Sequence, residues 1–289
     1  MSARIVTLMF VLGCSGPAAD GDATANGSGS DTQGLPTTGS GGPGGASTGE
    51  GTAAPVSSFT SGGYLLNHLA LVAEHDTDGD GETDNNLPLI LNLVNVLMGT
   101  DDFSVESVNT QIAESLYPDN ILLVDALQQD STLILDLLLG VDDGSGLWVD
   151  PASYDDAGVP HSRMQGAFSD EIRFTVDADA IEIPIVIFEG VDPVPLRFEV
   201  VSLSGELDTA TLDASLYGAI PISGVINDMV DPLIPDEGYD LDGDGVPEPK
   251  EEILDLVWSI APSAGDIELG DGETGVSALL EFQASAEPF

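Results

Sequence analysis

Twelve residues near the C-terminus, Asp240–Glu251 (DLDGDGVPEPKE), have the residue types and spacing of a site for a hard metal ion. Ca²⁺ takes about six to eight oxygen ligands, and a loop of about 12 residues can supply them. Counted from Asp240, positions 1, 3, 5, 7, 9 and 12 offer oxygens from Asp240, Asp242, Asp244, the carbonyl of Val246, Glu248 and Glu251. Gly245, at position 6, allows the sharp turn with positive φ that such a loop needs. The sequence therefore predicts a calcium site.

This stretch resembles the calcium loop of the EF-hand family, on the pattern Asp-x-Asp-x-Asp-Gly followed by a glutamate at position 12. It departs from the family at position 8, where Pro247 replaces an aliphatic residue. In the family that residue pairs two hands through a short β-bridge, so the resemblance does not imply conventional pairing. The alternative is a solvated acidic turn that binds no metal.

A second Asp-rich stretch lies earlier in the chain, between residues 76 and 84. Counted from Asp76, positions 1, 3, 5, 7 and 9 offer oxygens from Asp76, Asp78, Asp80, the carbonyl of Glu82 and Asp84. Position 12 is Leu87, so the bidentate carboxylate is missing. The stretch resembles the aspartate-rich calcium repeats of thrombospondin type 3 modules. Because it has lost a carboxylate ligand, we expect it to bind Ca²⁺ more weakly than the later loop.

The charge of the chain is strongly unbalanced: 5 Lys and Arg residues stand against 51 Asp and Glu residues, a formal net charge of −46. Such a field repels nucleic acid and anionic membranes and attracts cations, so binding to a phosphate backbone is not expected. Self-repulsion at this level opposes compactness unless bound metal or counter-ions offset it. Calcium loops account for a cluster of the acids, and adaptation to salty surroundings would account for the rest.

The N-terminus carries Arg4, an apolar run and then Val11-Leu12-Gly13-Cys14, which holds the single cysteine. It resembles the lipobox of bacterial lipoprotein signal peptides. The resemblance implies a signal peptide over residues 1–13, acylation of Cys14 and an outer-membrane lipoprotein that faces the periplasm or the cell surface. The apolar run is too short to span a bilayer. A truncated secretory signal or a chance apolar start are the alternatives. Residues 14–61, rich in Gly, Ser and Thr, are predicted to be a disordered linker.

Residues 62–289 are predicted to form one α+β calcium-binding domain, with an alternative boundary near 160–170. Helical spacing or apolar runs of helical length predict helices over Gly63–His75, Leu87–Met98, Asp101–Leu116, Gly224–Pro235 and Glu251–Ile260. Strand-length apolar runs and alternation with period two predict strands over Asn120–Leu127, Thr132–Leu139, several segments of 170–222 and part of Asp266–Phe282. The expected fold has N-terminal helices around the first calcium loop, packed on a mainly antiparallel β-sheet, with the second calcium loop near the C-terminus.

The chain as a whole resembles a loose group of myxobacterial lipoproteins with no established activity. The shared features are the lipobox, the acidic Gly/Ser/Thr-rich linker, the Asp-rich loop before an apolar helix and a β-rich remainder. The resemblance implies a place in the cell envelope and no particular chemistry. We expect a lipid-anchored protein that binds structural Ca²⁺ and has a structural or recognition role, with an envelope protein or a glycan as partner. An envelope carrier of an apolar ligand is the alternative.

Motifs of known enzyme classes are absent from the sequence, which has no Gly-x-Ser-x-Gly elbow, P-loop, dinucleotide fingerprint or His-Glu-x-x-His. Its histidines do not cluster, and His68 lies on the predicted apolar stripe of a helix, where a core position is the usual role. Acid pairs such as Asp155/Asp156 or Glu251/Glu252 could serve a carboxylate-dependent hydrolase, but such pairs arise by chance in so acidic a chain. We therefore expect no catalytic activity, and hydrolysis is the weakest alternative.

Overall fold

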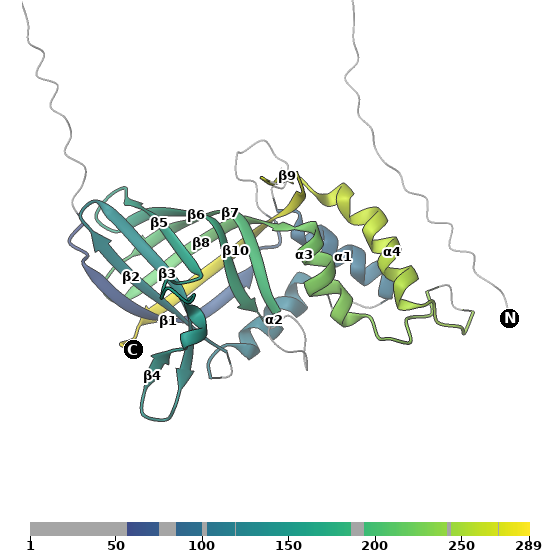
Figure 1. Cartoon of the computed structure of the whole chain (residues 1–289), viewed down its shortest axis with the longest axis horizontal. Coiled ribbons are helices and arrows are strands. Elements are labelled where there is room, and N and C mark those ends of the chain that lie inside the picture. The colour runs from purple at the N-terminus through teal and green to yellow at the C-terminus, as the bar shows by residue number, and fades with distance from the viewer. Residues whose placement is uncertain are drawn as a thin grey trace, which may run out of the picture. The chain divides into compact units, whose positions relative to one another are not determined.

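Eight antiparallel strands close into a barrel, in the order β1-β2-β3-β5-β6-β7-β8-β10, with β10 pairing back to β1 (Figure 1). This computed structural model describes residues 57–74, 85–99, 103–118, 120–185, 194–241, 244–270 and 272–289, all within the compact unit Gly51–Phe289. The barrel strands are β1 (Ser61–Leu71), β2 (Ile121–Gln129), β3 (Thr132–Asp142), β5 (Ser162–Phe168), β6 (Arg173–Ile185), β7 (Val194–Leu207), β8 (Thr211–Pro221) and β10 (Thr274–Ala286). Two short strands extend the sheet: β4 (Leu147–Val149) pairs with β3, and β9 (Ile267–Glu268) pairs with β10.

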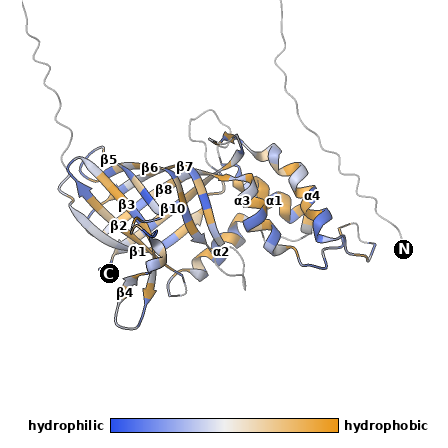
Figure 2. Cartoon of the chain, viewed as in Figure 1, coloured by the Kyte–Doolittle hydropathy of each residue, from blue (hydrophilic) through white to orange (hydrophobic). Residues whose placement is uncertain are grey.

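Apolar side chains fill the inside of the barrel. Along β8, Leu212, Ala214 and Leu216 are buried, while the residues between them are exposed, as expected for a strand with one face toward a core. Tyr64 and Phe198, from β1 and β7, are among the largest fully buried side chains. Figure 2 shows hydrophobic and hydrophilic residues alternating along the barrel strands. A barrel of eight strands is just wide enough for side chains to fill, and this one is packed in that way.

Apart from η1, which contacts β3 on the outer face, the helices lie toward one end of the barrel. The helical elements are α1 (Leu87–Met98), α2 (Val105–Ser115), η1 (Pro151–Ser153), α3 (Ile222–Gly224), η2 (Val225–Val230), η3 (Asp231–Leu233), α4 (Lys250–Ile260) and η4 (Ala261–Ala264). α3 continues without a break into η2, which is a π-helix, and then into the 3-10 turn η3. Figure 1 shows α1, α3 and α4 together beside the barrel, and contacts join α1 and α3 to β10 and α2 to β1.

A second, small core lies on the outer face of the barrel. Ile121, Leu123 and Leu138 point outward from β2 and β3 and are still buried. They are covered by partly buried apolar side chains from β1, from the segment around β4 and from the C-terminus: Leu65, Leu147, Val149, Tyr154 and Phe289. Ser153 fastens this cover, because its hydroxyl accepts a hydrogen bond from the Leu139 backbone N–H at 2.8 Å.

The helix predicted over Gly63–His75 is wrong in its described part, which is strand β1. Its buried residues are Tyr64, Leu66, Leu69 and Leu71. A register shift between Leu66 and His68 interrupts the ladder with β10, so the inward-facing set moves by one residue at that point. Two short alternating runs joined by a bulge imitate the spacing of a helix. His68 is half-buried on the ladder opposite Gln283 and does not lie on a helical stripe.

The expected fold class, α+β with N-terminal helices around a calcium loop, is also wrong. Strand makes up 48% of the described residues, and the structure is a mostly antiparallel closed barrel with a few short helices. The physical reason is β1: as a strand it joins β2 to β10 and closes the sheet. The helices predicted over Leu87–Met98 and Glu251–Ile260 are confirmed as α1 and α4, and the strands near 120–139 as β2 and β3. Within the described residues, no helix is long and apolar enough to cross a membrane.

Candidate functional site

The later Asp-rich stretch connects two packed helical segments. It follows η3 and leads directly into α4, whose Ile253 and Val257 are buried. Met229, in η2, is also buried, and α4 contacts η2. The Nζ atom of Lys250, the first residue of α4, lies 3.0 Å from Oδ1 of Asp231 in η3. The two ends of the stretch are therefore held by the same apolar and ionic contacts.

Carboxylates at the start of this loop accept hydrogen bonds from its backbone. Oδ2 of Asp240 accepts the N–H of Gly245 at 2.8 Å, so positions 1 and 6 are fastened together. Gly245 has φ +89°, in the left-handed region that a side chain resists. Oδ1 of Asp244 accepts the N–H of Val246 at 2.8 Å. The described part of the loop thus curls around the carboxylate of its first aspartate.

The far side of the loop is closed through Glu248. Its backbone N–H donates to the carbonyl of Tyr239 at 2.8 Å, in an antiparallel bridge between these two residues. Its Oε2 atom accepts the N–H of Leu241 at 2.6 Å. The bridge joins the residue just before position 1 to position 9, so it lies within one loop and does not require a second hand.

The predicted ligands of this loop fall into two groups. Asp240, Asp244, Val246 and Glu248 lie in the described loop, and Glu251 lies exposed in the first turn of α4. Asp242 is outside the described residues. Within the described part of the chain, no three His, Cys, Asp or Glu side chains converge on one point as a preformed metal site. The predicted ligands of the earlier stretch all lie outside the described residues: Asp76, Asp78, Asp80, Glu82 and Asp84. Cys14 also lies outside them.

Asn85, which follows the earlier stretch directly in sequence, was not among the predicted ligands. Its side chain is 3% exposed. The Nδ2 group donates to the carbonyl of Val72, and Oδ1 has no hydrogen-bond donor among the described residues. A buried oxygen without a donor calls for a partner, and an ion is one of the partners that satisfies it. The sequence signal was a polar pair, Asn85-Asn86, placed between the acids and the apolar helix α1.

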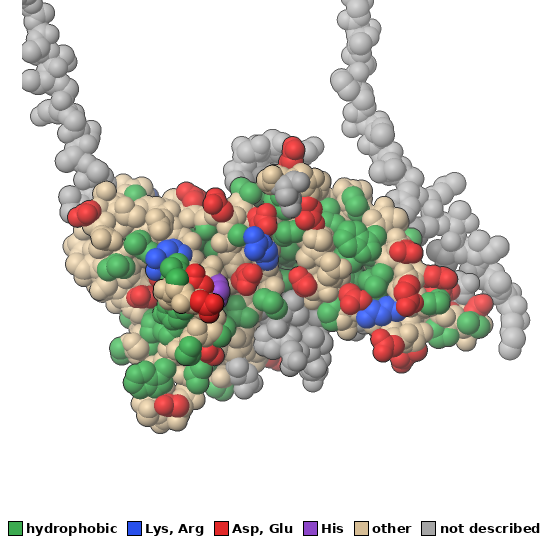
Figure 3. Space-filling view, in the orientation of Figure 1, with side chains coloured by type: hydrophobic (Ala, Val, Ile, Leu, Met, Phe, Trp, Pro, Cys, Tyr) green, Lys and Arg blue, Asp and Glu red, His purple; other side chains and the backbone are tan. Residues whose placement is uncertain are grey.

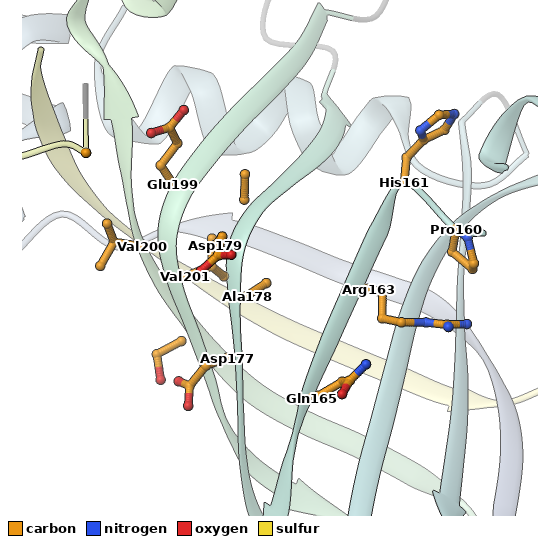
Figure 4. Close-up of a pocket in the computed structure, with 13 residues that line it drawn as sticks. Pro160, His161, Arg163, Gln165, Asp177, Ala178, Asp179, Glu199, Val200 and Val201 are labelled. Atoms are coloured by element: carbon orange, nitrogen blue, oxygen red, sulfur yellow. The ribbon is translucent and has the colours of Figure 1, made fainter. Parts of the chain in front are cut away.

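An outer groove lies where β5 and β6 separate. Their ladder runs only from Phe168 and Phe174 to Gln165 and Asp177, although β6 continues to residue 185. Further along, the Ser162 hydroxyl bridges the opening: it accepts the N–H of Glu182 and donates to the Glu182 carbonyl, both at 2.9 Å. A cavity of about 960 Å³ lies over this opening. Figure 4 shows Gln165 and His161 on the β5 side, with Asp177, Asp179 and Glu199 on the other.

The groove arises from a bend that β6 and β7 share. In β6 the inward set changes from Phe174 and Val176 to Ile181, and in β7 from Phe198 to Val201. The ladder between the two strands keeps one register across the bend, while the ladder between β7 and β8 shifts between Glu199 and Ser202. Val200 lies at this register shift and has φ +52°, which is an outlier for a β-branched residue. Its side chain is 56% exposed, at the wall of the groove.

Acidic side chains dominate the charge of the groove. Asp177 and Asp179 are exposed there, and of the ion pairs between described residues none includes either of them. Arg163 also lines the groove, but its Nε and Nη2 atoms donate to Asp136 at 2.7 and 2.8 Å, on the β3 side. That hydrogen bond raises the pKa of Arg163. The guanidinium is therefore committed to Asp136, and the groove keeps a net negative charge.

The same deficit of positive charge extends over the molecule. Each described basic side chain is already paired with a carboxylate: Arg163 with Asp136, Arg173 with Glu206, Arg197 with Glu199, and Lys250 with Asp231. Figure 3 shows acidic side chains scattered over the visible face, with few basic ones among them. Comparisons with protein families, with curated proteins and with solved structures find no match to this chain.

Proposed function

We propose that this chain is a calcium-binding scaffold of the cell envelope, whose packed barrel acts through its outer surface. The observation that carries the proposal is the contact between Asp240 and Gly245, which folds the loop around a carboxylate immediately before α4. Gly245, at position 6, provides the sharp turn that a calcium loop requires.

Calcium at this loop would stabilise the helical end of the barrel. The ion would tie the segment after η3 to the first turn of α4, where Glu251 lies. A ligand that binds only the folded state adds RT ln(1 + [L]/Kd), about 2.7 kcal/mol at a hundredfold excess over Kd. That is a large share of a stability of roughly 5–15 kcal/mol. Neutralising a part of the charge of −46 adds to the effect.

The earlier stretch is proposed as a second, weaker calcium loop. Support comes from Asn85, because its buried Oδ1 has no donor among the described residues and amide oxygens are good ligands for Ca²⁺. The ion would lie close to the barrel, since Asn86, the next residue, donates its N–H to the carbonyl of Ser277 in β10 at 3.1 Å.

The carrier alternative loses support from the packing of the barrel. A carrier would need a cavity among the inward side chains, and pockets for small molecules usually hold about 300–1,000 Å³. Ile181, Ile183 and Phe198 are at most 1% exposed. A cavity of about 20 Å³ lies between the helical end and the barrel core, lined in part by Phe198, Met229 and Leu280. That space is close to the room for one water molecule.

The hydrolase alternative has one arrangement in its favour. Asp177 and Asp179 both line the groove, and their places on one face of β6 set their Cα atoms roughly 6.8 Å apart. A glycosidase acid, however, needs a dry environment that raises its pKa. Both side chains are exposed to solvent, so the groove supports recognition better than hydrolysis. Asp155, from one predicted acid pair, instead caps its own loop, accepting the N–H of Ala157 and of Val159 at 2.8 Å.

The experiment is a calorimetric titration of Ca²⁺ into the metal-free protein and two variants. Glu251→Gln removes the carboxylate at position 12 and should weaken binding at the stronger site roughly tenfold, about 1.4 kcal/mol. Glu252→Gln is the matched control, because the adjacent side chain lies exposed in the same turn of α4 and carries the same charge. Its affinity should stay close to that of the unchanged protein. An equal loss of calcium affinity in both variants would mean that only the general negative charge matters, and it would reject the loop as the site.

A further inference from the structure

We propose that the groove between β5 and β6 binds an extended, lysine- or arginine-bearing peptide segment of another protein by strand addition along β6. The proposal names a partner for the outer surface and does not depend on metal at either loop. Three features of the described residues carry it: an open strand edge, a groove of suitable size with a small-residue floor, and uncompensated negative charge.

The strand edge is the first feature. β6 pairs with β7 from Arg173 to Ile185, but its pairing with β5 ends at Asp177. In the described ladders, the stretch from Ala178 to Ile181 therefore has a partner strand on one side only. Open edges of this kind are templates for another strand, and natural proteins usually cover or shorten them. Here the Ser162 hydroxyl, bonded to the backbone of Glu182, links β5 to β6 beyond the opening and does not fill it.

The shape of the groove is the second feature. Its cavity of about 960 Å³ falls within the range of ligand sites. The stretch of β6 that pairs on one side only, from Ala178 to Ile181, is roughly 10 Å long at the rise of an antiparallel strand. Ala178 and Ala180 line the groove on β6, so the backbone of a guest strand can approach the edge closely. In strand addition, main-chain hydrogen bonds supply affinity, and alternate side chains supply specificity.

Charge selects the occupant. Asp177 and Asp179 line the groove without a basic partner among the described residues, and Arg163 is held by Asp136. A second copy of this chain would bring another −46 charges and is repelled. The chain's own N-terminal residues 15–56 contain acids and no Lys or Arg, so they lack the complementary charge as well. A basic segment from a different protein remains the complementary guest.

The test is fluorescence anisotropy with the whole protein and a labelled hexapeptide of alternating lysine and valine, in about 0.15 M salt, where distant charges are screened. Saturable binding is expected. The double variant Asp177→Asn/Asp179→Asn should weaken it about tenfold, as the loss of two exposed charge contacts would. Asp213→Asn/Glu281→Gln is the matched control, since both residues are exposed on neighbouring barrel strands, β8 and β10, away from the groove lining. It should change the affinity less than twofold.

Backbone methylation separates strand addition from plain charge attraction. Two further peptides carry N-methyl groups at the odd or at the even residues, which keeps their charge and removes the N–H donors of one edge. At least one of them should lose binding about tenfold or more. Binding by both methylated peptides at the affinity of the parent would overturn the proposal, as would equal weakening in the control variant or no saturation at millimolar peptide. Melting curves of both double variants should match that of the unchanged protein.

Discussion

The backbone N–H of Gly245 donates to Oδ2 of Asp240 at 2.8 Å, which joins the sixth position of the Asp-rich loop to its first. This contact turns a sequence pattern into a folded loop. It depends on Gly245, because a backbone with φ +89° is strained for any residue that carries a side chain. The loop, the bridge from Tyr239 to Glu248 and the start of α4 then form one continuous unit at the end of the barrel.

Gly245→Ala should weaken calcium binding and lower the free energy of unfolding by roughly 1–2 kcal/mol. A Cβ at Gly245 would meet no atom within 4 Å, so the cost comes from the backbone conformation alone. Gly270→Ala is the control: its Cβ would also meet nothing, and its φ lies outside the left-handed region. Chemical denaturation of both variants checks the prediction, and a loss at Gly270 as large as that at Gly245 would contradict it.

Replacement of Arg163 by Gln should destabilise the protein by about 2 kcal/mol, less than for a fully buried pair because the arginine side chain is 36% exposed. It leaves Asp136, only 7% exposed, without its partner. Asp125, directly opposite on β2, then faces an uncompensated like charge. Adding Asp136→Asn should restore more than half of the loss in a denaturant titration. No recovery in the double variant would mean that the arginine stabilises through packing instead.

Tyr64 provides a pH-dependent prediction. Its hydroxyl donates to the carbonyl of Asp208 at 2.5 Å, and burial, with the nearby Asp208 carboxylate, raises the pKa of Tyr64 to about 12. The folded protein therefore holds this proton more tightly than the unfolded chain, whose tyrosines titrate near pH 10. The stabilisation is complete below about pH 10 and is lost as the pH rises toward 12.

Tyr64→Phe should accordingly cost about 1 kcal/mol at neutral pH, and the difference from the unchanged protein should shrink between pH 10 and 12. Because the other tyrosines are common to both proteins, their titration cancels in the comparison. Urea unfolding at a series of pH values provides the measurement. A difference that stays constant over that range would show that Tyr64 does not titrate as proposed.

Val200→Gly should leave the free energy of unfolding within about 1 kcal/mol of the unchanged protein, or raise it. Glycine relieves the strain of φ +52°, which offsets the greater entropy of the unfolded chain. The neighbouring Val201, 2% exposed, faces the core, so Val201→Gly should cost about 3 kcal/mol. A clear loss in Val200→Gly would show that its side chain contributes packing that offsets the strain.

Lipid attachment at Cys14 is tested by cell fractionation. Cys14→Ser should move the protein from the membrane fraction to the soluble one, because the acylated thiol is the predicted anchor. Ser15→Ala keeps the thiol and should stay in the membrane fraction. Persistent membrane association of Cys14→Ser would reject the predicted anchor.

Local patterns in the sequence predicted some elements well. The apolar run of α1 and the strand-length runs of β2 and β3 each depend on residues close together in the chain. The barrel itself was not predictable in this way. Its closure joins β1 to β10, which lie at opposite ends of the folded unit, and no local signal reports that pairing.

Two irregularities in the strands made other parts of the fold unpredictable from the sequence. The bulge between Leu66 and His68 disturbed the alternation of β1 and led to the wrong helix. The bend at Val200 leaves no mark in the sequence, because valine is a common strand residue and its positive φ is imposed by the ladders on either side. The groove follows from that bend and from the early end of the β5–β6 ladder, so only the structure revealed it. Asn85 was likewise recognised from its burial and not from its spacing.

The most direct test of the central claim is the thermal unfolding of the purified protein in millimolar Ca²⁺ and in excess chelator. The account predicts a midpoint higher in Ca²⁺ by roughly 5–10 °C, with most of the gain removed by Glu251→Gln and retained in Glu252→Gln. Superimposable melting curves in Ca²⁺ and chelator would contradict the account and reduce both Asp-rich stretches to solvated turns.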